Sequence, residues 1–218
     1  EFSSHIFLAG DSTDPQNIYF SAPLNATDFS PANGAGIINV GYKITAIKKF
    51  RNELFIFGAN TIKKLVGTTL ADFVLQGVTS NLGCVAPDSV VEFGGNLIFL
   101  GPDGIRPISG TDRIGDIELA PLSKEIQDIF DGYYQSEQVE DVSIVVIRRK
   151  SQFRLFFKDT ASLSLIGAVR KGQGNQGSLE YSQLTGITAN CVSSGFIGQY
   201  EFVIHGDSIG KVHRQERG

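Results

Sequence analysis

Hydrophobic and polar positions alternate along most of this chain, in short runs that are separated by polar or glycine-containing turns. Four runs share one form, in which a tight polar turn leads into a hydrophobic strand and a second turn leads into another strand. These copies lie at residues 51–58, 95–101, 152–157 and 199–206. Period-two alternation rich in β-branched and aromatic residues is typical of β-strands. Equivalent points in the copies fall about 40–60 residues apart, which is the period expected of four-stranded propeller blades.

The repeat predicts about five blades, of which three are nearly complete and two are partial. The clearest blade has expected strands at 44–50, 54–57, 62–66 and 72–78. The next two have expected strands at 88–93, 97–100 and 104–109, with a weaker outer strand near 117–119, and at 142–147, 153–157, 163–169 and 179–184. The partial blades have expected strands at 5–10, 17–21 and 36–40, and at 187–192, 200–205 and 208–213. Pro107 falls inside one expected strand and must take an exposed or bulged position, because proline cannot donate to the ladder.

One segment departs from the strand pattern and predicts a short amphipathic helix inserted between blades, near residues 122–130. Its apolar residues recur at helical spacing on one face: Leu122, Ile126, Ile129 and Phe130. Ser123 is a candidate N-cap, and Gly132 stands where a helix would end. We expect the apolar face to pack on the propeller, with packing on a partner chain as the alternative.

Length and composition fit a single all-β propeller domain over residues 1–218. The 25 glycines exceed the usual share of about 7% and suit a chain with many tight turns. The chain contains no Met and its end blades are incomplete, so we expect it to be a fragment of a longer polypeptide. No apolar run approaches the ~20 residues that a membrane-spanning helix needs. The net charge of −4 removes the strongest argument for nucleic-acid binding, which is an excess of clustered Lys and Arg.

No set of nucleophile, base and acid is recognisable in the sequence, and we expect no catalytic, metal or cofactor site. The three histidines, His5, His205 and His213, lack the spacing of zinc ligands. His205 and His213 fall on or beside adjacent expected strands and could approach each other, either as structural residues or as a metal pair. Cys84 and Cys191 are far apart and have no CxxC spacing, which favours two buried free thiols over a disulfide or a reactive site.

The strongest basic clusters are Arg148-Arg149-Lys150 and Arg170-Lys171, which lie at the ends of expected strands and plausibly share one rim. Charged residues in turns are most often only solvated. The alternative is a rim that contacts phosphates or an acidic partner subunit through Arg148, Arg149, Lys150, Arg170 and Lys171.

Several segments between Asn17 and Ser123 resemble a known family. They lie at residues 17–21 with 26–29, 44–57, 83–91 and 99–106, and the blade pattern continues beyond them to the end of the chain. They are similar to segments of the tail nozzle, tail tubular or packaged-DNA-stabilisation proteins of short-tailed phages and related prophages. The resemblance implies a β-propeller hub that assembles as a ring, commonly of six copies, below the portal and adaptor. Such a ring holds the packaged genome in and lets it leave at infection.

The sequence as a whole therefore predicts a non-enzymatic structural virion protein of a phage or prophage tail, assembled in the bacterial host cytoplasm. Its expected partners are further copies of itself in a ring, the portal, adaptor and tail-fibre proteins, and packaged DNA in non-specific contact. The first alternative is an unrelated propeller adaptor that binds proteins through its loops. The second is a propeller glycan hydrolase, which needs a convergent carboxylate pair. Candidate carboxylates such as Glu92 and Glu201 show no shared position across the blades.

Overall fold

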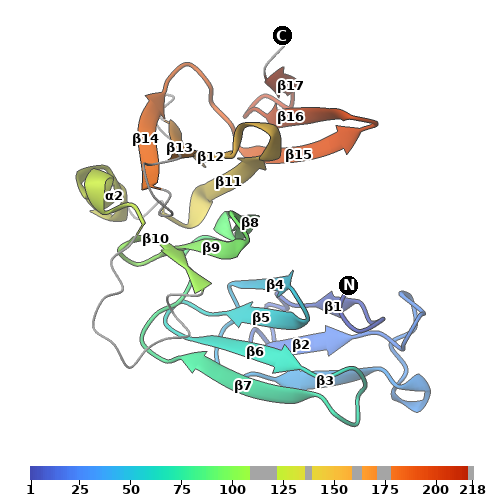
Figure 1. The fold of residues 1–218 in the computed structure, drawn as a ribbon. Helices are drawn as coiled ribbons and strands as arrows, with labels where there is room; N and C mark the ends of the chain where they lie inside the picture. The colour runs from blue at the N-terminus through green and yellow to red at the C-terminus, as the bar shows by residue number, and fades with distance from the viewer. Residues whose placement is uncertain (109–121, 136–138, 159–163, 171–177, 216–218) are drawn as a thin grey trace. The chain divides into compact units, whose positions relative to one another are not determined.

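A computed structural model describes residues 1–108, 122–135, 139–158, 164–170 and 178–215 of the chain. These residues form five antiparallel sheets, and every sheet is built from strands that follow one another in the sequence (Figure 1). The five sheets coincide with the five predicted blades. They fall into two compact units, the first made by Glu1–Val85 and the second by the described residues from Ala86 onward.

The first unit contains two sheets. One has the order β1-β2-β3 and the other β4-β5-β6-β7. A 3₁₀ turn, η1 (Pro31–Asn33), precedes β3. The strands are β1 (Phe7–Leu8), β2 (Asn17–Phe20), β3 (Gly36–Asn39), β4 (Ala46–Phe50), β5 (Glu53–Phe57), β6 (Ile62–Val66) and β7 (Val74–Thr79). The second of these sheets confirms all four strands of the blade that the sequence pattern predicts most clearly.

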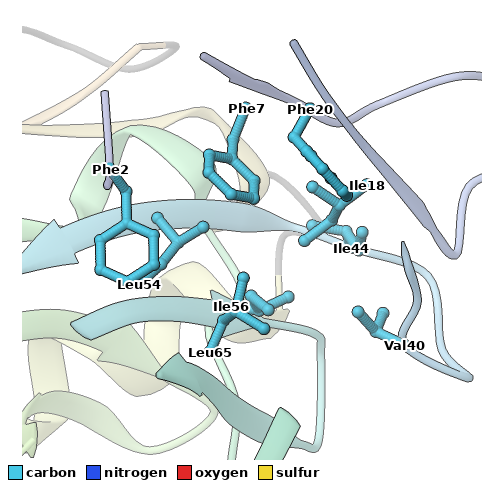
Figure 2. Close-up of a cluster of buried hydrophobic side chains, with 9 residues drawn as sticks. All are labelled: Phe2, Phe7, Ile18, Phe20, Val40, Ile44, Leu54, Ile56 and Leu65. Carbon is cyan, nitrogen blue, oxygen red and sulfur yellow. The ribbon is translucent and has the colours of Figure 1, made fainter. Parts of the chain in front are cut away.

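The core of the first unit gathers the apolar face of each sheet (Figure 2). Alternate residues of β2 and β5 point into it, as the period-two pattern requires. The buried residues of this core are Phe2, Phe7, Ile18, Phe20, Val40, Ile44, Leu54, Ile56 and Leu65. His5 also belongs to this core: it is 3% exposed, and its Nδ1 donates to the Ser21 carbonyl at 2.6 Å. This histidine is therefore a structural residue whose polar atom is satisfied inside the core.

The second unit contains three sheets, with orders β8-β9-β10, β11-β12-β13-β14 and β15-β16-β17. The strands of the first two are β8 (Val91–Phe93), β9 (Asn96–Gly101), β10 (Gly104–Pro107), β11 (Val142–Ile147), β12 (Gln152–Phe157), β13 (Ser164–Arg170) and β14 (Ser178–Leu184). The last sheet has β15 (Cys191–Ile197), β16 (Tyr200–Gly206) and β17 (Val212–Gln215). Short 3₁₀ turns lie at η2 (Pro87–Ser89), η3 (Lys124–Ile126), η4 (Val139–Asp141) and η5 (Arg148–Lys150).

Strand β11 is the inner strand of this unit. All six of its residues are buried, and it contacts β8 and β15, the first strands of the two other sheets. A strand buried on both faces has an unbroken apolar run instead of alternation, and Val142–Ile147 has this run except at Ser143. First strands that lie beside one another are the arrangement expected of propeller blades.

The expected third strand at 104–109 is shorter in the structure, because β10 ends at Pro107. Pro107 is half-buried and pairs with Ile98, in a strand at the edge of its described sheet. An edge strand tolerates proline because its outward side needs no ladder donor. The outer strand expected near 117–119 lies outside the described residues.

The inserted helix differs from the prediction at both ends. η3 leads into α2 (Gln127–Gln135), which continues past Gly132 instead of ending there. Ser123 makes no side-chain cap; its buried Oγ accepts the Ile105 N–H at 3.0 Å. Phe130 is fully buried and lies against Phe157 with ring centroids 6.1 Å apart, so the apolar face packs on a blade as expected.

Two strands of the last sheet begin later than predicted. β15 starts at Cys191 and not at Ile187, and β17 starts at Val212 and not at Ser208. The second shift has a local cause, because Asp207 Oδ1 accepts the N–H groups of Ile209 and Lys211 at 3.0 and 2.8 Å. These bonds hold residues 207–211 in a turn.

Candidate functional site

The candidate site is the basic turn, which we define as Arg148, Arg149 and Lys150. It forms η5 and connects the inner strand β11 to β12. Ser151 closes it in the left-handed conformation, with φ 49°, and donates its N–H to the Arg148 carbonyl at 3.1 Å. All three basic residues are exposed. The sequence therefore placed these cations correctly at a strand end.

Glu201 of β16 fixes the backbone of the basic turn. Its Oε1 accepts the Arg148 N–H at 2.8 Å, and its Oε2 accepts the Arg149 N–H at 2.9 Å. A carboxylate that accepts two backbone N–H groups forms charge-assisted bonds, which are stronger than neutral ones. The three cationic side chains consequently extend from a turn whose backbone is held in place. Sequence reasoning considered Glu201 only as a catalytic carboxylate, because no local pattern connects residues 53 positions apart.

Two hollows flank the basic turn. One has a volume of about 420 Å³ and is lined by Arg148, Ser151 and Val169 together with the β8–β9 turn. The other, which we call the cationic hollow, has a volume of about 530 Å³. Its lining includes Arg149, Lys150, Tyr200, Glu201, Arg214 and Gln215. Ligand and peptide side chains occupy concave sites of this size.

The neighbouring hairpin turns carry no charge. Gly94 and Gly95 form the β8–β9 turn with φ of 61° and 75°, and Gly198 begins the β15–β16 turn with φ of 60°. Positive φ values are accessible to glycine without steric cost, which explains these residues in two-residue hairpins. The turns that flank the basic turn are therefore small and neutral.

The side chains of the other two rim residues of the sequence prediction lie outside the described part of the structure. Arg170 is the last residue of β13, but its side chain lies outside the described part, as does the whole of Lys171. The idea that all five cations share one rim stays a prediction.

The two C-terminal histidines come together as the strand pattern suggested. His205 and His213 are direct cross-strand partners, with stacked rings whose centroids lie 4.9 Å apart. His213 Nε2 donates to Asp207 Oδ2 at 2.7 Å. Burial, followed by the nearby His213 charge, lowers the pKa of His205. Across the described ranges, no group of three or more His, Cys, Asp and Glu side chains is arranged to hold a metal ion.

The two cysteines are both free, with Cys84 buried and Cys191 exposed. The structure thus agrees with two free thiols, but the expected burial holds for Cys84 and is wrong for Cys191. Within the part of the chain that the structure describes, no helix has the length and apolar character needed to cross a membrane.

Comparison with known families finds a match. The family model described as bacteriophage P22 Gp10, β-propeller, matches residues 4–156, which is more than half of the chain. The match covers the first unit, the β8–β10 sheet and the basic turn, and it ends within β12. No curated protein matches the chain.

Proposed function

This chain belongs to the family of the bacteriophage P22 Gp10 β-propeller, and from that premise we propose that it forms a ring in the tail of a phage or prophage virion. The family is one of phage structural proteins, and the all-β structure agrees with a propeller of that type. The proposed ring retains packaged DNA and provides the channel through which the DNA leaves. We further propose that residues 1–218 act as one propeller domain within it.

The observation that carries this proposal is the series of five meander sheets in a chain of the P22 Gp10 family. Such a scaffold acts through its shape and its surfaces, without needing a reactive group. The net charge of −4 suits a channel wall, because a weakly acidic surface does not hold DNA by counterion release. We therefore propose a non-enzymatic role that depends on geometry and subunit contacts.

The proposed partners are further copies of the chain, the portal and adaptor, and tail-fibre proteins. A ring requires heterologous contacts, in which one surface of a subunit meets a different surface of the next. The family resemblance suggests six copies. We propose the virion tail as the location of the protein, after assembly in the host cytoplasm.

Electron microscopy and a genome-retention assay test this function. The protein that carries this chain is purified and imaged by negative stain, where a closed ring is the expected result. Virions assembled without it are then treated with DNase, and the expected result is loss of packaged DNA that complementation restores. A monodisperse monomer with peptide affinity would instead favour a protein-binding adaptor. Release of sugar from a capsule or cell-wall panel would overturn the non-enzymatic role.

A further inference from the structure

The surface around the cationic hollow combines charge with exposed apolar area. Ile197 and Tyr200 are cross-strand partners beside the β15–β16 turn, and they are 70% and 58% exposed. Tyr200 also lines the cationic hollow, with Arg149, Lys150 and Arg214. Exposed apolar side chains beside three cations are unusual for a turn that is only solvated.

We propose that this surface binds an acidic segment of a neighbouring protein subunit, with carboxylates in the cationic hollow and an apolar side chain on Ile197 and Tyr200. The inference deepens the proposed ring by naming one of its contact surfaces, and to that extent it rests on the proposed function. The chemistry of the occupant follows from charge complementarity with Arg149, Lys150 and Arg214. Tyr and Arg are also the residue types most enriched where protein interfaces gain their affinity.

Preorganisation supports this assignment. Glu201 holds the backbone of Arg148 and Arg149 through two hydrogen bonds, so the turn loses little conformational freedom when a partner binds. Arg214 is similarly positioned, because its guanidinium carbon lies 4.1 Å from the centre of the Phe202 ring. A cation that stacks on an aromatic ring keeps its hydrogen-bond donors available at the ring edge.

A protein segment fits this surface better than the backbone of DNA. The Glu201 carboxylate lines the same hollow. Its negative charge would repel the closely spaced phosphates of DNA. DNA affinity depends on the number of phosphates that cations neutralise, and this hollow has three cations in a chain whose net charge is −4. Burial of the exposed apolar surface of Ile197 and Tyr200 against apolar side chains would contribute favourable binding free energy. A phosphodiester backbone offers no such side chains.

Binding of defined probes to the intact protein tests the inference. The probes are a fluorescent peptide of alternating Glu and Leu, its counterpart with Gln in place of Glu, and a short random-sequence DNA duplex. We expect the Glu peptide to bind best and more weakly at high salt. The double charge reversal Arg149→Glu with Lys150→Glu should weaken the Glu peptide about tenfold or more, as for buried hot-spot charges at interfaces. Tyr200→Ala should weaken it severalfold.

A matched control reverses two exposed lysines in the first unit, Lys48→Glu with Lys49→Glu, which change the net charge by the same amount. This control should leave peptide binding within about twofold, because neither lysine lines the cationic hollow. All variants are first compared by circular dichroism and thermal unfolding. No binding of the Glu peptide, or equal binding by the charge-reversed variant, would overturn the inference. Tighter binding of the duplex that is lost in the same variant would reassign the surface to phosphates.

The result is separable from the proposed function. If the charge-reversed variant loses both the peptide and the ring, the surface is a ring contact. If it loses the peptide and keeps the ring, the surface binds another virion protein. A wild-type protein that binds the peptide and forms no ring would contradict the ring and leave the surface inference intact.

Discussion

The imidazole rings of His205 and His213 stack with 18° between their planes, and each is anchored by a different neighbour. Gln215 Nε2 lies 3.2 Å from His205 Nδ1, while His213 donates to Asp207. Protonation of His205 is unfavourable for two reasons: its partial burial disfavours the charged form, and a positive charge on His213 would repel it. The protonation of His205 is therefore coupled to the stability of the sheet in the pH range where histidine titrates.

We predict that acidification weakens the β15–β17 sheet through His205. Its folded pKa lies below the ordinary value of 6.5, so the unfolded chain binds protons first as the pH falls. The contribution is fully present above the unfolded pKa and is lost as the pH drops through the lowered one. Thermal unfolding between about pH 8 and pH 5 should show this loss. His205→Asn, which keeps an acceptor for Gln215 and does not titrate, should flatten the profile; an unchanged slope would contradict the assignment.

Removing the Glu201 carboxylate should loosen the basic turn. In Glu201→Gln one carboxylate oxygen is replaced by an NH2 group, which cannot accept a backbone N–H, so one of the two bonds is lost. We expect a cost of about 1 kcal/mol in the free energy of unfolding, the usual net value of such a bond. Hydrogen exchange at the Arg148 and Arg149 amides should become faster. Glu92→Gln, on an exposed residue of β8, is the control and should leave that exchange unchanged.

The strands that could be predicted best are those whose alternation pattern and bounding turns are both visible within a short stretch of sequence. Residues 44–78 and 142–184 alternate or run apolar between clear turns, and the structure confirms four strands in each. The late start of β17 was missed because Asp207 organises its turn through side-chain bonds. Helix α2 passes Gly132, where a Cβ would meet open space, so nothing in the packing requires a glycine at that point.

Contacts over long sequence separations could not be predicted. The buried hydroxyls of Ser89 and Ser123 accept strand N–H groups from Leu100 and Ile105, but serine is equally common in ordinary turns. The hydrogen bonds from the Arg148 and Arg149 N–H groups to Glu201 likewise depend on contact between two sheets. The charge of the basic turn was visible in the sequence, whereas the side chains that surround it were not.

The β6–β7 turn should contribute stability that acid removes. Asp72 accepts the N–H and hydroxyl groups of both Thr68 and Thr69, and the bonds from Thr69 lower the pKa of Asp72 to about 2. The contribution is present above the ordinary carboxyl pKa of 3.8 and is lost as the pH falls through the folded value. Urea unfolding from pH 5 down to about pH 2 should show the decline. Asp72→Asn should remove this part of it, whereas the exposed Asp88→Asn should not; equal profiles would count against the turn.

Two sheets share one cross-strand pairing, in which a phenylalanine of the second strand covers a glycine of the third. Phe20 is opposite Gly36 and Phe153 is opposite Gly167 in the strand register. A Cβ on Gly167 would lie 2.3 Å from the Phe153 ring, which also packs on Phe93 with centroids 5.1 Å apart. The fully buried ring therefore cannot shift without disturbing its neighbours.

We predict that Gly167→Ala destabilises the second unit by about 1–3 kcal/mol, the usual effect of overpacking a core. The control is Gly195→Ala in β15, where an added Cβ meets nothing within 4 Å and the reduced backbone entropy of the unfolded chain should leave stability equal or higher. Unfolding in urea, followed by circular dichroism because the chain has no Trp, measures both variants. Adding Phe153→Leu to Gly167→Ala should cost less than the sum of the two single changes, since the smaller side chain relieves the clash. Strict additivity, or equal stability of the two alanine variants, would show that the ring does not rest on the glycine.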